Sequence, residues 1–258
     1  MSFTSRTALV TGASRGIGCA VAQALLDQGA RVVVTARSLE SLQPKVSGWV
    51  SDKLSVYPVV CELTDPTAGE QLISAVEATV GHIDILINNA GVGHASPFAR
   101  TTLEAYEQVM AANATSVFLT TRAFMPRMAK RGFGRIVNIA STAAKTGAAY
   151  TAAYTASKHA VLGLTRVAAA ESVGTGVTVN AVCPGFVDTA MTQQTISRIV
   201  AKTGRTSDDA LAAVLQASGQ QRLVSTSEVA HAVMGLCHPN ASATNGQSVV
   251  VDGGALHS

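Results

Sequence analysis

Thr11-Gly12-Ala13-Ser14-Arg15-Gly16-Ile17-Gly18 stands between a short apolar run, residues 8–10, and a stretch of helical periodicity, residues 17–28. Glycines at such a junction permit a tight turn and let a pyrophosphate approach the backbone closely. The following helix N-terminus offers free N–H groups and a positive dipole end to the phosphates. The spacing is G-x-x-x-G-x-G, not the commoner G-x-G-x-x-G. Because glycine turns are often only turns, the position between strand and helix is what favours a dinucleotide site.

Short β-branched runs alternate with longer helical stretches outward from this motif. Further helices are expected over about 106–130 and from 154 to about 173. Strands are predicted at residues 8–10, 31–35, 54–60, 83–87, 135–140, 177–182 and 248–251. Near-continuous apolar strands separated by helices indicate a parallel sheet covered on both faces. With right-handed crossovers, this pattern predicts an α/β fold: a Rossmann-type, doubly wound, seven-stranded parallel sheet in a single domain over residues 1–258.

Residues 191–222 break this rhythm. The segment is rich in Gln, Thr and Ala, and it contains one expected helical piece near residues 208–216. A connection of this length between sheet elements is more often functional than disordered. It is therefore predicted to be a substrate lid.

The residues after the second predicted strand bear on cofactor choice. An NAD site usually places a carboxylate there, to bind the ribose 2′-hydroxyl. This chain has Thr35-Ala36-Arg37-Ser38 instead. Arg37, together with Arg15 of the glycine turn, can clamp a 2′-phosphate by charge-assisted hydrogen bonds. The alternative is two solvated surface arginines, but the missing acid favours NADP(H) over NAD(H).

A tyrosine and a lysine share one helix face in Tyr154-Thr155-Ala156-Ser157-Lys158. An ammonium beside a phenol favours the phenolate, so Lys158 is expected to lower the pKa of Tyr154 toward neutrality. Ser141 follows the strand predicted at residues 135–140, at the carboxyl edge where ligands bind in open α/β sheets. Its hydroxyl can donate to a substrate oxygen, although a serine after a strand is often only a turn residue.

These motifs occur together with Asn88-Asn89-Ala90-Gly91, Asn113, Pro184-Gly185 and Asp252-Gly253-Gly254. In this order and spacing the chain resembles the short-chain dehydrogenase/reductase family over essentially its whole length. The resemblance implies hydride transfer between a nicotinamide and an alcohol or ketone, and commonly a homotetramer.

The resemblance also implies roles for individual residues. Tyr154 donates the proton to the carbonyl oxygen, and Ser141 holds and polarises that carbonyl. Lys158 lowers the pKa of the tyrosine and binds the nicotinamide ribose, while Asn113 supports a water that links Lys158 to solvent. Besides Tyr154 and Lys158, the implied cofactor contacts are Gly12, Ser14, Arg15, Gly16, Ile17, Gly18, Arg37, Glu62, Leu63, Asn89, Ala90, Gly91, Pro184, Gly185, Val187 and Thr189. Glu62 replaces the family's usual Asp, which puts the adenine contact in doubt.

The substrate is less closely indicated. Residues 136–142 and 180–186 resemble reductases of β-keto thioesters and polyketides. Lys130-Arg131 offers cations to an acidic acyl carrier, but the segment before Gly176 offers none, so a CoA thioester is favoured. The lid carries four cations, which either bind CoA phosphates or a substrate carboxylate, or form a solvated surface. These cations are Arg198, Lys202, Arg205 and Arg222.

Three alternatives stay open beside the thioester. His94 either reaches the pocket or is a surface histidine. A cyclic, aromatic or polyketide ketone is the second substrate class. A dinucleotide sensor without turnover is disfavoured, because Asn113, Ser141, Tyr154 and Lys158 are all present.

Composition excludes other classes. The 258 residues are 47% hydrophobic and 14% charged, and the net charge is +3 without a basic run, so no nucleic-acid partner is expected. The longest stretch without charged residues, 229–251, contains His, Pro and Asn and does not suit a membrane span. The 4 cysteines form no CxxC pair and the 6 histidines show no ligand spacing, so no metal is expected. Without an N-terminal apolar segment, the protein is expected in the cytoplasm.

Overall fold

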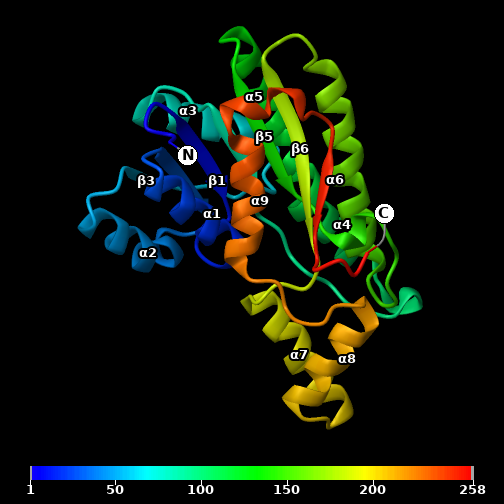
Figure 1. Cartoon of the computed structure of the whole chain (residues 1–258). Helices are drawn as coiled ribbons and strands as arrows, with labels where there is room; N and C mark the ends of the chain where they lie inside the picture. Colours follow the sequence, from blue (N-terminus) through cyan, green and yellow to red (C-terminus); the bar gives the residue numbers. More distant parts are fainter. Residues whose placement is uncertain (1, 257–258) are drawn as a thin grey trace.

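The computed structural model describes residues 2–256, and its core is one parallel sheet (Figure 1). The 7 strands lie in the order β3-β2-β1-β4-β5-β6-β7, which confirms the predicted doubly wound fold. Their bounds are β1 Thr7–Thr11, β2 Arg31–Ala36, β3 Val56–Val60, β4 Ile85–Asn88, β5 Gly134–Ile139, β6 Val177–Pro184 and β7 Ser248–Val251. The chain starts in the middle of the sheet, builds outward to β3, then crosses back to β4. The topological switch between β1 and β4 is where ligands bind in such sheets.

Helices cover both faces of the sheet. Their bounds are α1 Gly16–Asp27, α2 Leu39–Ser51, α3 Ala68–Thr79, α4 Leu103–Met110, α5 Ser116–Lys130, α6 Ala152–Glu171, α7 Ala190–Thr203, α8 Ser207–Ser218 and α9 Thr226–Cys237. Apolar side chains of α1, α2 and α9 pack on one face of the sheet, for example Leu25, Trp49 and Val233. Those of α3 and α5 pack on the other, for example Leu72 and Phe124. Because both faces are covered, β1, β4, β5 and β6 are buried along their whole length and consist mostly of apolar residues.

The expected long helix over about 106–130 is present and contains one irregular turn. Residues Ala111–Thr115 form a π-helical turn (η2) between α4 and α5, and this turn contains Asn113. Such turns inside α-helices are frequent at functional sites, because the extra residue re-aims a side chain. The predicted helical segment is therefore present, but periodicity alone does not show the π-helical turn inside it.

The lid contains two helices, α7 and α8, where the sequence indicated one helical piece. Both begin at threonine caps: the hydroxyls of Thr189 and Thr206 accept backbone N–H bonds. Both end at a left-handed glycine, Gly204 and Gly219. The two helices form a separate lobe beyond the carboxyl edge of the sheet, at the bottom of Figure 1.

Candidate active site

The glycine turn leaves its backbone open at the carboxyl end of β1. Gly12 and Gly16 have φ of +63° and +59°, which favours glycine. A Cβ on Gly12 would lie 2.9 Å from the Cα of Ala90, and one on Gly18 would lie 2.5 Å from the carbonyl oxygen of Gly12. Side chains are thus excluded at Gly12 and Gly18 by their neighbours, and the turn keeps a bare main chain.

The helix that follows has no cap of its own. The N-cap residue Arg15 is extended and makes no side-chain cap hydrogen bond, and the first turn of α1 carries no acidic residue. By contrast, α7, α8 and α9 are all capped by their own hydroxyl side chains. The first N–H groups of α1 therefore remain available to an anion, which fits the pyrophosphate of a dinucleotide.

Asn89 and Thr11 hold this turn against β4. The Thr11 hydroxyl accepts from the backbone N–H groups of Asn89 at 2.9 Å and Ala90 at 3.1 Å. In return, Asn89 Nδ2 donates to the carbonyls of Thr11 at 2.9 Å and Gly12 at 3.0 Å. Both protons of the Asn89 side-chain amide are thus donated to carbonyls of the turn. A contact of this residue with the ribose stays a prediction.

The two arginines predicted to clamp a 2′-phosphate lie beside the turn. Arg37 directly follows β2, Arg15 lies in the turn, and both are exposed. Within residues 2–256, neither guanidinium has a protein partner. The loop after β3 is nearby, since the N–H of Cys61 donates to the Ala36 carbonyl. On that loop Glu62 is exposed, whereas the side chain of Leu63 is buried in the core and leaves only its main chain for a ligand.

The predicted catalytic residues meet at the carboxyl edge of β4 and β5. Asn113 is fully buried: its Oδ1 accepts from the Val92 N–H at 2.7 Å, and its Nδ2 donates to the Val92 carbonyl and to Ser157 Oγ, both at 3.0 Å. Lys158, also buried, donates from Nζ to the Ile139 carbonyl at 2.9 Å, and Nζ lies 5.8 Å from the centre of the Tyr154 ring. A Cβ on Gly91 would lie 2.9 Å from Asn113 Oδ1 and 3.8 Å from Lys158 Nζ.

The proton affinities differ from the expectation. Burial raises the pKa of the Tyr154 phenol, and an interaction with the Ser141 hydroxyl only partly opposes the rise. Burial lowers the pKa of Lys158 to about 8, with a smaller opposite effect from Cys183. The direction of the pKa shift at Tyr154 is thus upward, because desolvation of the buried phenol is the largest cause and Lys158 is not among the causes. A lowering of this pKa by Lys158 stays a prediction.

The opposite wall of the crevice follows β6. Pro184 ends this strand, Val187 is buried, and Thr189 begins the lid. A Cβ on Gly16 would lie 3.4 Å from Thr189 Cγ2, so the start of the lid faces the glycine turn directly. The glycine turn, the buried lysine and the segment after β6 thus lie near one another at the carboxyl edge of the sheet, where ligands bind in such folds.

Residues 6–199 match the family described as short chain dehydrogenase. The chain belongs to the short-chain dehydrogenase family. It is 36% identical over 256 residues to the 3-oxoacyl-[acyl-carrier-protein] reductase FabG of Salmonella typhimurium, covering 98% of both chains. It is 32% identical over 255 residues to D-beta-hydroxybutyrate dehydrogenase of Rhizobium meliloti, covering 97% of this chain and 98% of the relative. A structure of an actinorhodin polyketide ketoreductase variant with NADPH superposes with a TM-score of 0.92 at 36% identity, covering 99% of both chains.

This short-chain dehydrogenase is therefore an oxidoreductase that interconverts ketones and alcohols with a nicotinamide cofactor. Sequence analysis did not identify two residues, Ser157 and Gln220, whose hydrogen bonds stabilise the site. Ser157 accepts from Asn113 and donates to the Tyr154 carbonyl at 2.7 Å, and Gln220 accepts from the Phe186 N–H at 2.7 Å. Two of these three bonds join segments far apart in the chain, and the third lies within one turn of α6. No motif or spacing in the sequence indicates them.

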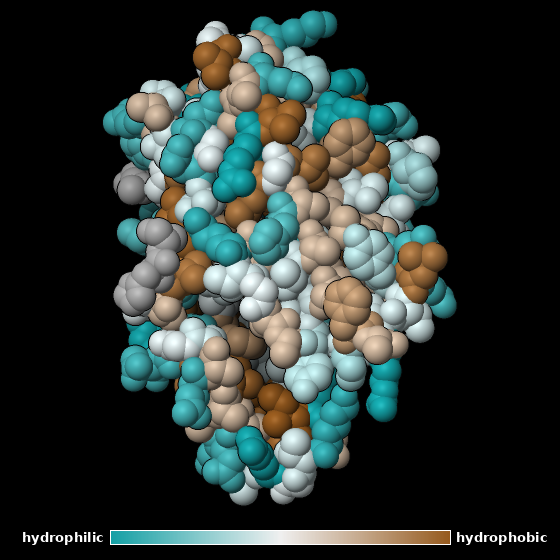
Figure 2. Space-filling view, turned by 90° about the vertical axis from the view of Figure 1, so that its right-hand side faces the viewer, coloured by the Kyte–Doolittle hydropathy of each residue, from teal (hydrophilic) through white to brown (hydrophobic). Residues whose placement is uncertain are grey.

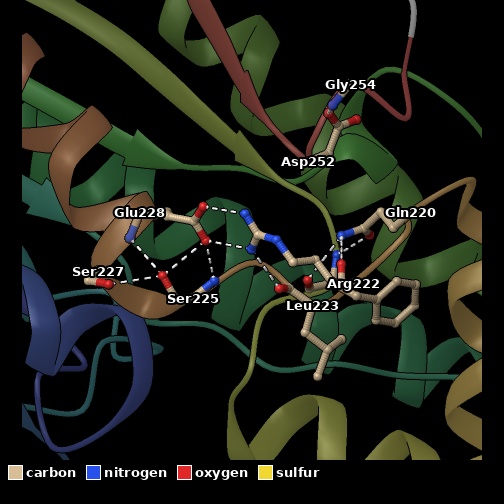
Figure 3. Close-up of polar contacts among 9 residues, drawn as sticks. Gln220, Arg222, Leu223, Ser225, Ser227, Glu228, Asp252 and Gly254 are labelled. Atoms are coloured by element: carbon tan, nitrogen blue, oxygen red, sulfur yellow. Dashed lines mark hydrogen bonds and ion pairs between the residues drawn. The ribbon is translucent and has the colours of Figure 1, made fainter.

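Arg222 has a partner within the protein. It forms a bidentate ion pair with Glu228 of α9, at 2.6 and 2.9 Å (Figure 3). Glu228 also accepts from the Ser225 N–H at 2.8 Å, and these bonds lower the pKa of its carboxyl to about 2. A hollow of about 390 Å³ adjoins this pair, but its lining includes none of the predicted catalytic residues. The other lid cations, Arg198, Lys202 and Arg205, are exposed.

Within residues 2–256, no group of His, Cys, Asp or Glu side chains is arranged to hold a metal ion. In the same part of the chain, no helix is both long and apolar enough to cross a membrane.

Proposed function

We propose that this enzyme transfers hydride between NADP(H) and a 3-oxoacyl or 3-hydroxyacyl thioester, with CoA as the carrier. The observation that carries the proposal is the meeting of Ser141, Tyr154, Lys158 and Asn113 beside an uncapped helix N-terminus. The similarity to FabG, whose name specifies a 3-oxoacyl substrate, supports the acyl class.

The proposed chemistry assigns one task to each side chain. NADP(H), when bound, supplies the hydride to the carbonyl carbon. The Tyr154 phenol, whose pKa is raised by burial, holds its proton and donates it to the carbonyl oxygen. The Ser141 Oγ accepts from the Ala143 N–H at 3.1 Å, so its own proton is free for the same oxygen. Charge developing on that oxygen thus meets two preplaced donors.

Lys158 and Asn113 act behind these two donors. Lys158 Nζ spends one proton on the Ile139 carbonyl, which leaves two for the ribose hydroxyls. Asn113 fixes the main chain at Val92, and with it the floor of the crevice. Its proposed water contact requires a rearrangement of these bonds or a second lone pair of Oδ1.

The first test is steady-state oxidation of NADPH and of NADH with acetoacetyl-CoA. We expect turnover with NADPH, and a Tyr154→Phe variant should lose at least about 100-fold in kcat because it has no proton to donate. Binding of NADPH, followed by fluorescence titration, should persist in this variant. A Tyr154→Phe variant with unchanged kcat would refute the assigned proton donor.

The preference for NADP(H) has its own test. An Arg37→Asp change should raise the Kd for NADPH about 10- to 100-fold, since a charge-assisted hydrogen bond is lost and a repulsion gained. The Kd for NADH should change far less, because NADH has no 2′-phosphate. Equal effects on both nucleotides would show that Arg37 is a solvated surface residue. Arg198→Asp is a suitable control, because Arg198 is exposed. Arg31→Asp is not suitable, because Arg31 donates a hydrogen bond to Thr7 within the fold.

A neutral cyclic or aromatic ketone is the second candidate substrate. Large apolar side chains are exposed on the segments that border the crevice: Val92, Phe98, Tyr150 and Met191. Figure 2 shows a group of hydrophobic side chains in the lower part of the molecule, bordered by hydrophilic ones. Turnover of 1-decalone in preference to acetoacetyl-CoA would favour this candidate.

The assembly and location are proposed from the resemblance. Exposed apolar side chains on α4, α5 and α6, namely Leu103, Phe118 and Val167, suit burial against further copies of the chain. Light scattering should give the mass of a homotetramer. The cytoplasmic location and the single domain over residues 1–258 stay predictions.

A further inference from the structure

Two short segments attach the lid helices to the rest of the protein, and they lie side by side. The outgoing segment, residues 185–189, joins β6 to α7, and the returning segment, residues 219–225, joins α8 to α9. Val187 and Val224 form a parallel bridge between them, in which the Val224 N–H donates to the Phe186 carbonyl at 3.0 Å. The two attachments of the lid are therefore held together through their main chains.

Gln220 of the returning segment adds a second link, through its side chain. The residue is 5% exposed. Its Oε1 accepts from the Phe186 N–H at 2.7 Å, and its Nε2 donates to the Phe186 carbonyl at 3.2 Å and to the Arg222 carbonyl at 3.3 Å (Figure 3). One amide thus pairs with both main-chain groups of Phe186, as a neighbouring strand does. Both protons of this amide are donated within the protein, so neither is left for a ligand.

The space for the Gln220 amide exists because residue 185 is a glycine. A Cβ on Gly185 would lie 2.5 Å from Gln220 Oε1 and 3.0 Å from Asp252 Cβ. The amide is therefore packed directly against the outgoing segment. The returning segment is fixed in turn, because Arg222 forms its bidentate ion pair with Glu228 of α9. Gln220 thus holds the outgoing segment in place relative to α9.

The outgoing segment lies on the side of the glycine turn where the nicotinamide is expected. In the sheet, β1 has β2 and β3 on one side and β4, β5 and β6 on the other. Arg37, predicted to bind the 2′-phosphate of the adenosine half, follows β2, whereas Ser141 follows β5 and the outgoing segment follows β6. The outgoing segment also reaches the turn itself, since a Cβ on Gly16 would lie 3.4 Å from Thr189 Cγ2.

The main chain of Val187 is not used by the bridge to the returning segment. The hydrogen bonds of that bridge are made by the residues beside it, Phe186 and Asp188, so the N–H and carbonyl of Val187 point away from Val224. The carbonyl accepts from the Thr192 hydroxyl at 2.6 Å. The Val187 N–H has no main-chain acceptor within residues 2–256. An N–H group without a partner fits the predicted role of Val187 as a cofactor contact, because the carboxamide of a nicotinamide carries an acceptor oxygen.

We propose that Gln220 is a positioning residue for the nicotinamide half of the cofactor. Its amide fixes Phe186, and thereby the neighbouring Val187 N–H, in the orientation that binds the nicotinamide carboxamide. Gln220 does not touch the cofactor and acts only through the main chain of the outgoing segment. The proposal rests on the proposed function, in particular on the predicted cofactor contact of Val187.

The test compares the binding of NADPH with that of adenosine 2′,5′-bisphosphate, which carries the adenosine half without the nicotinamide. Isothermal titration calorimetry gives both Kd values. Gln220→Met keeps a side chain of similar length without its hydrogen bonds. In this variant we expect the Kd for NADPH to rise about 10-fold, the effect of roughly one lost hydrogen bond, and the Kd for adenosine 2′,5′-bisphosphate to stay within about twofold. Gln221→Met is the matched control, because Gln221 is the exposed neighbour of the same residue type.

A second measurement needs no nucleotide. Hydrogen exchange of the outgoing segment, followed by mass spectrometry, should be faster in Gln220→Met than in the wild type, because the Phe186 N–H loses its acceptor. Gln221→Met should exchange as the wild type does. Unchanged exchange in folded Gln220→Met would overturn the proposal, because the amide would then not hold this segment.

The binding outcomes separate this proposal from the proposed function. Equal changes in both Kd values, or no change in either, would overturn the proposal even though nucleotide binding stands. A wild type that binds neither ligand would contradict the proposed cofactor, and with it this proposal, before any variant is measured. Should Gln220→Met not fold, Gln220→Glu carries the same comparison at pH 8. Its carboxylate still accepts from the Phe186 N–H but cannot donate to the two carbonyls, so the Kd for NADPH alone should rise.

Discussion

At the scale of single residues, the buried lysine of the active site works against the stability of the fold. Lys158 has only the Ile139 carbonyl as a hydrogen-bond partner and no carboxylate within ion-pair distance in residues 2–256. Burial lowers its pKa from 10.5 to about 8. A buried cation of this kind lowers the stability of the folded protein, and its proposed catalytic role explains why it is present.

A Lys158→Met variant should therefore unfold less readily at pH 7, by on the order of 3 kcal/mol, since one pKa unit is about 1.4 kcal/mol. Because the pKa is lower in the folded state, the unfolded wild type binds more protons between pH 8 and 10.5, so its stability rises with pH there. The advantage of the variant should accordingly shrink between pH 7 and 10. Urea unfolding at both values measures it. A variant less stable than the wild type at pH 7 would contradict this account.

At the scale of elements, the β1–α1 turn depends on two glycines for space. An alanine in a helix is normally better than a glycine, by about 0.5–1 kcal/mol. Gly18 should show the reverse, because its Cβ would collide with the Asn89 amide and the Gly12 carbonyl.

We expect Gly18→Ala to destabilise the protein by about 2 kcal/mol and to weaken NADPH binding, as overpacking does at a rigid site. Gly48→Ala in α2 is the matched control, since nothing lies within 4 Å of its added Cβ. That change should stabilise the protein slightly. Urea midpoints of both variants decide the matter: a stabilised Gly18→Ala would show that the turn is not tightly packed.

At the scale of the whole molecule, the residues proposed to bind ligands lie at the carboxyl ends of the strands, whereas a group of stabilising contacts lies at the amino ends. The amino ends of β5 and β6 meet at Arg135, which is 2% exposed. Its guanidinium donates to the carbonyls of Gly134, Gly176, His238 and Pro239 at 2.7 to 3.3 Å. The Phe133 ring lies under it at 4.6 Å, with Arg6 also over that ring, at 3.6 Å.

Arg135→Lys should lower the free energy of unfolding by about 2–4 kcal/mol, because an ammonium cannot reach all these carbonyls. The kcat/KM and the Kd for NADPH should stay unchanged, because the active site lies at the opposite, carboxyl ends of the strands. Denaturant unfolding and steady-state kinetics on the same samples test both halves. A loss of activity in folded protein would show that the two ends are coupled.

The sequence by itself determined the succession of the seven strands along the chain, the position of the glycine turn and the spacing of Tyr154 and Lys158. These features follow from local rules: periodicity, the conformations open to glycine, and the faces of a helix. The same rules did not predict α2, α3, α9 and the first lid helix α7, because much of the stability of these helices comes from packing against the rest of the fold.

Only the tertiary structure decided what each polar group meets. It turned Arg222 toward Glu228, placed Asn113 in a π-helical turn against Val92, and left His94 Nδ1 without a partner. It also raised the pKa of Tyr154, where the sequence indicated a lowering. Each of these outcomes depends on desolvation and on contacts between residues distant in the chain. Such contacts arise only when the sheet brings its strand ends together.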